Sequence, residues 1–186
     1  PRAYKVCSSQ IQVLSPMQRG TLGTVNLNRA LQEALNPGKG GLVRGAVSFR
    51  RGDRVMQLKN NYDKDVYNGD MGHIVSIDWE EQSVRVSFDG REVDYDSSDL
   101  DELTLSYATT IHKSQGSEFP IVVMPVLMAH FVMLQRNLIY TGITRAKKIC
   151  VLVGETKALN TAIRNVSSLQ RYTRLSQRLA EMVKSL

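Results

Sequence analysis

The chain has 186 residues, 42% of them hydrophobic and 23% charged, which is typical of a folded globular protein rather than a disordered one. No apolar run approaches the ~20 residues that cross a bilayer, so we expect no membrane partner and a cytoplasmic location. Two distant cysteines and three isolated histidines show no metal-ligand spacing, and we expect no metal site in this chain.

Charge is distributed unevenly along the chain. Residues 51–102 hold six Lys or Arg and fourteen Asp or Glu, a net charge of −8. The rest of the chain holds eighteen Lys or Arg and four acidic residues, a net charge of +14. This contrast indicates two units of different character, and the basic unit suits a polyanion such as nucleic acid or a nucleotide phosphate.

The first 48 residues predict one strand and one helix. The run IQVLS at residues 11–15 is short and apolar, as in a buried strand, and Pro16 ends it. After a glycine-containing loop, apolar residues recur at helical spacing over residues 25–35, until Asn36-Pro37-Gly38 stops the pattern. Strand, loop and helix in this order form the repeating element of an α/β layer.

Short β-like runs follow between residues 49 and 102. They are RVMQL, HIVSIDW, SVRVSF and REVDY, all rich in β-branched or alternating apolar residues. Turn signals such as Asn68-Gly69-Asp70 and Asp89-Gly90 separate them. Strands this short and this close together predict a small β-barrel of the Src-homology-3-like kind.

The α/β pattern returns at Leu103. The expected elements are strands at LTLSYAT, IVVMPVL and KICVLVG, helices over residues 133–146 and 157–165, and a last helix over 169–186. We therefore expect an α/β domain formed by residues 1–48 and 103–186. The small barrel at residues 49–102 interrupts it.

A dense polar cluster lies where the first of these strands ends. Thr110, His112, Lys113 and Gln115 offer hydroxyl, imidazole, ammonium and amide groups, and Gly116 permits a tight turn. Such a cluster at the carboxyl end of a strand can bind a phosphodiester backbone. A capped turn alone would explain the hydroxyl groups but would leave the histidine, lysine and glutamine without a role.

Two arginines are candidates for phosphate contacts. Arg145 shares helical spacing with Thr141, Thr144 and Lys148, which predicts one cationic, hydroxyl-rich helix face. Arg19 follows the first strand, on the side of an open α/β sheet where ligands bind. Taken alone, each pattern favours an ordinary solvent-exposed arginine over a phosphate contact.

Three segments resemble the motifs of superfamily 1 helicases. TTIHKSQGSEF resembles motif V, NLIYTGITRAKK resembles motif VI, and QVLSPMQRG is similar to motif IV. A small barrel between motifs IV and V, holding DRVMQLKNNYDKDVYNGDMG, resembles the RecD-type branch, relatives of the exodeoxyribonuclease V alpha subunit that move 5′ to 3′. The likeness runs from about Gln12 to Gly154, and it implies a RecA-like motor domain for the α/β part.

The resemblance implies a nucleotide-facing group of residues. Arg145 would be the motif VI arginine that reaches the γ-phosphate of ATP bound between two motor domains, and Arg19 would be its motif IV companion. Such arginines are worth roughly 10³ to 10⁵ in rate in comparable systems. Gly116 and Glu118 match the part of motif V that faces the nucleotide.

The resemblance also implies contacts with single-stranded DNA. Thr110, His112 and Lys113 match DNA-contacting positions of motif V, and Gln115 would couple the DNA grip to the nucleotide state. On the barrel, we expect contact through an early segment whose residues are polar, cationic or aromatic: Lys59, Asn60, Asn61, Tyr62 and Lys64.

One element of a complete motor is absent from the sequence. No G-x-x-x-x-G-K-[ST] phosphate-binding loop occurs, so the ligands of ATP-bound Mg²⁺ are expected on an N-terminal motor domain of the same protein. We expect this chain to be the second motor half of a DNA repair and recombination helicase, without ATP hydrolysis on its own. Other exonuclease subunits would be further partners.

Two alternatives stay open at this point. The chain can be a stand-alone nucleic-acid-binding module that has kept a motor-like fold without catalysis. Within the enzyme class, relatives of the Pif or conjugative-relaxase kind share similar motifs V and VI.

Overall fold

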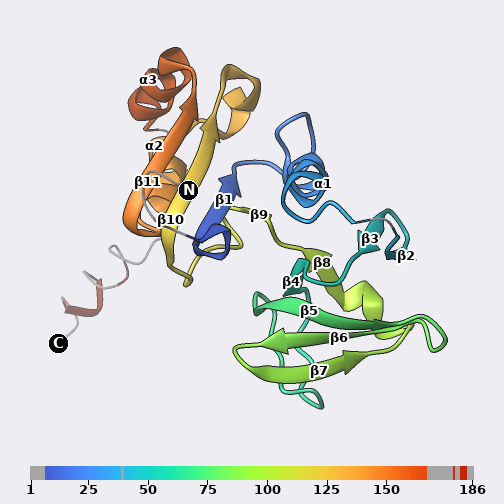
Figure 1. Cartoon of the computed structure of the whole chain (residues 1–186). Helices are drawn as coiled ribbons and strands as arrows, with labels where there is room; N and C mark the ends of the chain where they lie inside the picture. The colour runs from blue at the N-terminus through green and yellow to red at the C-terminus, as the bar shows by residue number, and fades with distance from the viewer. Residues whose placement is uncertain (1–6, 39, 167–177, 179–180, 184–186) are drawn as a thin grey trace.

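A four-stranded parallel sheet forms one half of the computed structural model, which describes residues 7–38, 40–166, 178 and 181–183 (Figure 1). Its strand order is β11-β10-β1-β9. The bounds are β1 Ile11–Ser15, β9 Ala108–Thr110, β10 Phe119–Val126 and β11 Ala146–Gly154. The expected strand at residues 11–15 is confirmed, and its central place in the sheet explains its apolar character.

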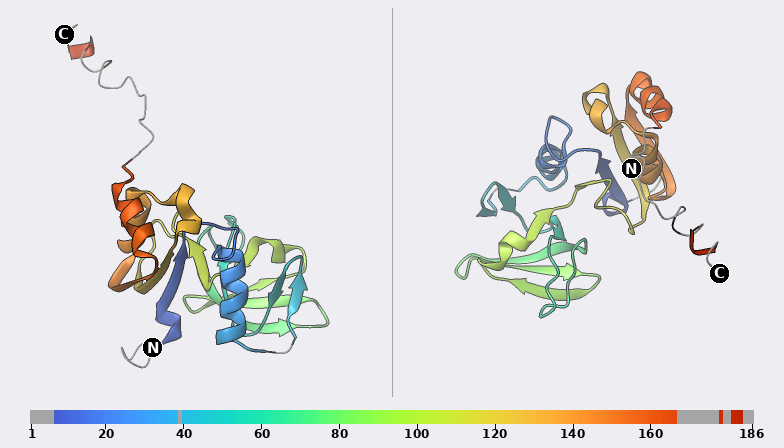
Figure 2. Two further views of the ribbon diagram at one scale, coloured as in Figure 1. Left: turned by 90° about the horizontal axis from the view of Figure 1, so that it is seen from above. Right: turned by 180° about the vertical axis from the view of Figure 1, so that it is seen from behind.

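Two helices pack on one face of this sheet. They are α2 (Arg136–Ile143) and α3 (Thr156–Arg164), and the 3₁₀ turn η4 (Met128–Met133) precedes α2. Leu14, Val122 and Met124 from the strands meet Leu138 and Ala162 from the helices in one buried core. Figures 1 and 2 show both helices against the strands.

The helix expected over residues 133–146 is shorter than predicted. It begins only after η4 and ends at Ile143, because the chain turns at Thr144 and enters β11 at Ala146. Arg145 therefore lies in the turn after α2 and Lys148 lies in β11, so the predicted helix face is wrong for both residues. The second expected helix is confirmed as α3, whereas the last helix predicted over 169–186 lies outside the described residues.

A five-stranded antiparallel sheet forms the other half, in the order β7-β6-β5-β4-β8. The bounds are β4 Arg54–Gln57, β5 Met71–Asp78, β6 Ser83–Phe88, β7 Arg91–Tyr95 and β8 Leu103–Leu105, with the 3₁₀ turn η3 (Asp99–Glu102) before β8. All four predicted runs form strands. The unit has its own core, which includes Phe49, Val55, Val86 and Tyr95.

The run LTLSYAT, expected as one strand of the α/β domain, is divided between the two sheets. Leu103–Leu105 forms β8 and pairs with β4, whereas Ala108–Thr110 forms β9 and pairs with β1. Leu103 and Leu105 are buried in the core of the five-stranded unit. That sheet therefore extends three residues past the expected boundary at residue 102.

The chain between β1 and β4 crosses from one sheet to the other. Helix α1 (Thr24–Leu35) borders the parallel sheet, where the Asn28 amide bonds both backbone groups of Ala108 on β9. A short hairpin follows, made of β2 (Leu42–Arg44) and β3 (Val47–Phe49), which the sequence did not predict. Figure 2 shows α1 and this hairpin beside the antiparallel sheet.

A buried polar network joins the two halves. The Arg54 guanidinium donates to the Ile11 carbonyl and to Gln12 Oε1, both at 2.7 Å. The Tyr107 hydroxyl donates to Asp53 Oδ1 at 2.9 Å, and burial raises the pKa of that tyrosine. Because buried polar groups need partners, this network fixes the position of the two halves relative to each other.

Among the described residues, no helix is long and apolar enough to cross a bilayer.

Candidate nucleotide and nucleic-acid interface

The predicted polar cluster forms a tight turn directly after β9. The Ser114 amide donates to the Thr110 carbonyl at 3.1 Å, and the buried Ser114 hydroxyl donates to the Ile111 carbonyl at 2.8 Å. Gly116 has φ +88, a backbone conformation that favours glycine. His112 and Lys113 are exposed on this turn, so both can reach a ligand.

Arg145 lies against the same turn. Its guanidinium donates to the Thr141 carbonyl at 3.3 Å, to the Ser117 carbonyl at 3.1 Å and to Thr144 Oγ1 at 3.3 Å. An arginine has five N–H donors, so these bonds orient the group and leave two N–H groups for a ligand. Within the described part of the chain, no carboxylate forms an ion pair with Arg145.

Glu118 is next to this arginine in space but pairs with a different cation. Its carboxylate lies 3.4 Å from Lys147 Nζ, and both side chains are 57% exposed. Exposed pairs of this kind contribute little to stability. Glu118 is therefore free to exchange its partner when a ligand approaches the turn.

Arg19 lies away from Arg145. It is an exposed residue of the loop that follows the carboxyl end of β1, where the Ser15 hydroxyl bonds the Leu22 carbonyl. Arg145 instead precedes β11, at the amino ends of β10 and β11, where Ala146 pairs with Phe119. The structure thus places the two predicted catalytic arginines at opposite ends of the parallel strands and does not bring them together.

A small hollow of about 190 Å³ connects the turn with α2. His112 and Gln115 line it from the turn, and Asn137, Leu138 and Thr141 line it from α2. This hollow therefore joins His112 and Gln115, from the segment that resembles motif V, to α2, from the segment that resembles motif VI. Gln115 thus faces α2 across this hollow, and its coupling role stays a prediction.

The predicted DNA-contacting segment of the barrel forms a loop between β4 and β5. Lys59, Asn60 and Tyr62 are exposed, and Tyr62 is 75% accessible. The Tyr62 ring stacks edge-on against Tyr67, with centroids 6.1 Å apart. Tyr67 thus lies beside Tyr62 on this loop, five residues later in the sequence.

Lys64, unlike Lys59, is held by contacts within the barrel, and its DNA contact stays a prediction. Its ammonium lies 2.9 Å from Asp99 and 5.0 Å from the centroid of the Tyr95 ring, with 24% of the side chain exposed. Lys64 therefore stabilises the barrel. The residues next to Lys64 do not indicate this ion pair, because Asp99 lies 35 positions later in the sequence.

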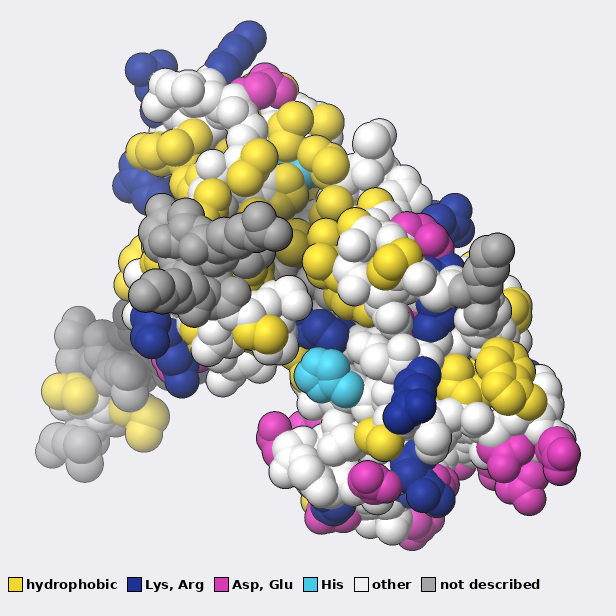
Figure 3. All heavy atoms as spheres, viewed as in Figure 1, with side chains coloured by type: hydrophobic (Ala, Val, Ile, Leu, Met, Phe, Trp, Pro, Cys, Tyr) yellow, Lys and Arg dark blue, Asp and Glu magenta, His cyan; other side chains and the backbone are white. Residues whose placement is uncertain are grey.

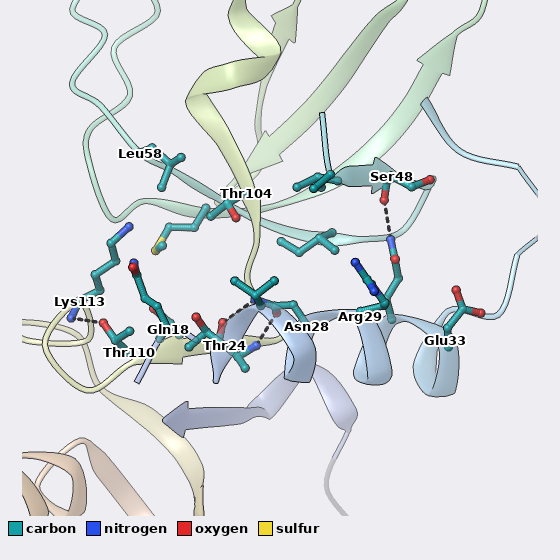
Figure 4. A pocket seen from close by; sticks show the side chains of 18 of the residues that line it. Gln18, Thr24, Asn28, Arg29, Glu33, Ser48, Leu58, Thr104, Thr110 and Lys113 are labelled. Atoms are coloured by element: carbon teal, nitrogen blue, oxygen red, sulfur yellow. Dashed lines mark hydrogen bonds between the residues drawn. The ribbon is translucent and has the colours of Figure 1, made fainter. Parts of the chain in front are cut away.

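A larger cavity of about 520 Å³ lies between α1, the β2–β3 hairpin and strands of both sheets (Figure 4). Thr110 and Lys113 line one end, and Arg29 and Glu33 line it from α1. This cavity could not be predicted from the sequence, because its lining comes from segments far apart along the chain. No periodicity or motif marks such a junction.

Acidic side chains gather on the barrel and are sparse over the α/β half (Figure 3). Several acids of the barrel are paired: Arg85 with Asp94 and Arg44 with Asp101. Hydrogen bonding by Arg44 lowers the pKa of Asp101, and the bond from Arg85 lowers that of Asp94. Within the part of the chain that the structure describes, no group of three or more His, Cys, Asp or Glu residues is arranged to hold a metal ion.

Comparisons with known families match both halves. Residues 27–88 match the family described as the ATP-dependent RecD-like DNA helicase SH3 domain. Residues 105–153 match the UvrD-like helicase C-terminal domain, which covers the turn after β9, α2 and Arg145. The two matches together span the predicted site residues of the barrel, of the turn after β9 and of Arg145, whereas Arg19 lies outside both.

Curated relatives align along most of the chain. The ATP-dependent RecD2 DNA helicase of Deinococcus radiodurans is 39% identical over 167 residues, 87% of this chain and 23% of the relative. The RecBCD enzyme subunit RecD of Haemophilus influenzae is 32% identical over 168 residues, 90% of this chain and 25% of the relative. The chain thus spans about a quarter of the length of these relatives.

Solved structures share the fold at low sequence identity. A Pif1 helicase studied for DNA unwinding at forked double-stranded DNA aligns with a TM-score of 0.58 and 17% identity, covering 97% of this chain and 45% of that one. Bacteroides Pif1 in complex with ADP-AlF3 and single-stranded DNA gives a TM-score of 0.55 at 16% identity, covering 93% and 45%. The chain thus joins a RecD-like helicase SH3 domain to a UvrD-like helicase C-terminal domain, and along most of its length it is similar to about one quarter of the length of RecD-type DNA helicases.

Proposed function

We propose that the chain is the second motor domain of an ATP-dependent DNA helicase or translocase of the RecD type that moves 5′ to 3′ on single-stranded DNA. Residues 1–48 and 103–186 would form the motor domain, and residues 49–102, extended by β8, the inserted barrel. ATP would bind between this chain and the N-terminal motor domain of the same protein, which would supply the Mg²⁺ ligands. The isolated chain would not hydrolyse ATP.

One observation carries this proposal: Arg145 is oriented by three hydrogen bonds, one of them to Ser117 of the turn that holds the DNA-contacting candidates. An oriented guanidinium with spare donors and no paired carboxylate among the described residues is suited to stabilise charge that develops on a γ-phosphate. The motif IV role of Arg19 rests on the resemblance alone, because Arg19 lies at the other end of the strands.

The same arrangement suits coupling between nucleotide and DNA. Arg145 contacts one end of the turn at Ser117, whereas Thr110, His112 and Lys113 form the other end. A change at the nucleotide would shift the turn and alter the DNA contacts, with Gln115 between them. Gly116 and Glu118 lie on the part of the turn nearest Arg145. The RecBCD-type subunits named among the relatives make further protein partners part of this proposal.

The DNA half of the proposal is tested by binding of a short oligo-dT to this chain at several salt concentrations. Lys113→Ala and Lys59→Ala remove two exposed cations from the proposed path, and Lys157→Ala on α3 is the matched control. Each lysine that contacts a phosphate should lower the salt slope by about 0.7, whereas the control should leave it unchanged. Equal slopes for all three variants would overturn these contacts.

A further inference from the structure

The cavity between α1 and the barrel has the size and chemistry of a ligand site. Its volume of about 520 Å³ lies within the ~300–1,000 Å³ of small-molecule pockets. Met56, Leu58 and Leu105 give it apolar walls from the barrel sheet, and Val25 and Ala108 add apolar surface from the α/β half. Flat apolar walls of this kind suit a planar, weakly polar group.

Two residues in the lining hold buried polar atoms without partners. Thr109 Oγ1 and Arg50 Nε are both buried and form no hydrogen bond within the described structure. Unpaired buried polar atoms are rare and costly, so they mark places where a bound group can supply the missing bond. The ring nitrogens and carbonyl oxygens of a nucleobase are such groups.

The charges at the rim point to a polyanion. Lys113 stands at one end beside Thr110, and Arg29 extends from α1 over the middle of the cavity (Figure 4). At the far end Arg50 pairs with Glu33, which closes that end to a further anion. A phosphate group therefore fits beside Lys113 or Arg29, and the attached base fits the apolar interior.

The cavity also continues the proposed DNA path. Thr110 and Lys113 belong both to the cavity and to the DNA-contacting turn, and Leu58 in the opposite wall directly precedes Lys59. A strand that runs from the turn to the barrel loop thus passes the mouth of the cavity.

We propose that this cavity takes up one unstacked nucleobase of the bound single-stranded DNA, with its phosphate held at the Lys113 and Arg29 rim. The inference rests on the proposed DNA-binding function. It adds a subsite formed jointly by the motor half and the barrel. A base held there fixes the register of the strand between the two halves.

The test compares oligo-dT with an oligomer of equal length that has the same phosphodiester backbone and no bases. Ala46 is exposed and lines the cavity, so Ala46→Trp fills it, whereas Ala34→Trp places the same ring on an exposed site of α1 outside the cavity. Base stacking or burial contributes roughly tenfold in affinity per base. We expect Ala46→Trp to weaken oligo-dT binding about tenfold and to leave binding of the baseless oligomer unchanged.

Unchanged binding of the baseless oligomer also shows that the variant has folded. Equal effects of Ala46→Trp on both oligomers, or no effect on either, would overturn the base site while the DNA-binding proposal stands. Absence of salt-sensitive binding by the unmodified chain to either oligomer would overturn both. A second readout is 2-aminopurine placed in the oligomer, whose fluorescence should change on binding to the Ala34→Trp control and not to Ala46→Trp.

Discussion

Three hydrogen bonds orient the Arg145 guanidinium, from the end of α2 and from the turn after β9. Two of its three bonds go to backbone carbonyls, at Thr141 and Ser117, and the third goes to the Thr144 hydroxyl. Backbone acceptors tolerate most substitutions at their own positions, so only Thr144 contributes through its side chain. That difference allows the positioning of the arginine to be tested without removing it.

Thr144→Val should lower ATP hydrolysis by the full-length protein about fivefold, because one hydrogen bond to the guanidinium is lost and such a bond is worth about 1 kcal/mol. Binding of single-stranded DNA should not change. Thr141→Val is the matched control, since its hydroxyl bonds the Asn137 carbonyl and its own carbonyl stays in place. Equal losses in both variants would contradict a positioning role for Thr144.

His130 should make stability depend on pH. It is buried in η4 with Nδ1 unpaired among the described groups, and burial lowers its pKa below the ordinary 6.5. A base with a lowered folded-state pKa is more readily protonated when unfolded, so stability is lost as pH falls through 6.5. Denaturant melts between pH 7.5 and 5 should show a smaller loss for His130→Phe. An identical pH dependence in both proteins would contradict this.

Local sequence was a good guide to residue type and a poor guide to partners. The cluster Thr110, His112 and Lys113 was found from its composition because its residues are adjacent. The contacts of Lys64 could not be predicted, because Asp99 and the Tyr95 ring, which hold it, come from distant segments. The neighbourhood of a long charged side chain is decided by tertiary packing.

The strands were predictable because their apolar runs are continuous or alternate cleanly, as in β1 and β6. The run that became β8 and β9 could not be divided correctly, since each strand has only three residues and no Gly, Pro or Asn turn signal separates them. The β2–β3 hairpin was missed because each strand has three residues, too few for a period to show. The ends of these short strands are therefore set by the strands with which they pair, which the sequence alone does not reveal.

The free energy of unfolding should depend on Asp53, which bonds residues where the two halves meet. This buried carboxylate accepts bonds from Tyr107, Gln32, Asn36 and the Arg50 amide, at 2.5–2.9 Å. Asp53→Ala removes the acceptor of all four bonds, leaves the Tyr107 hydroxyl and the Arg50 amide without it, and should cost about 3 kcal/mol or more of unfolding free energy. Asp63→Ala, at an exposed position, should stay within about 0.5 kcal/mol. Urea unfolding measures both, and a similar small loss would contradict the role of the network.

Acidic and basic side chains are concentrated on different halves of the molecule. The acidic barrel presents paired carboxylates, while the parallel-sheet half carries the excess of Lys and Arg (Figure 3). The α/β class, the barrel and the polar turn followed from the sequence. The cavity between the halves and the distance between Arg19 and Arg145 required the structure, because both depend on how separate elements meet.

The central claim is that Arg145 serves a nucleotide at the junction of two motor domains. Its most direct test is DNA-stimulated ATP hydrolysis by the full-length protein, comparing the unmodified enzyme with Arg145→Ala and Arg145→Lys. We predict a loss of about 10³-fold or more for the alanine variant, little rescue by lysine, and unchanged affinity for single-stranded DNA. Hydrolysis at the unmodified rate in Arg145→Ala would contradict the account.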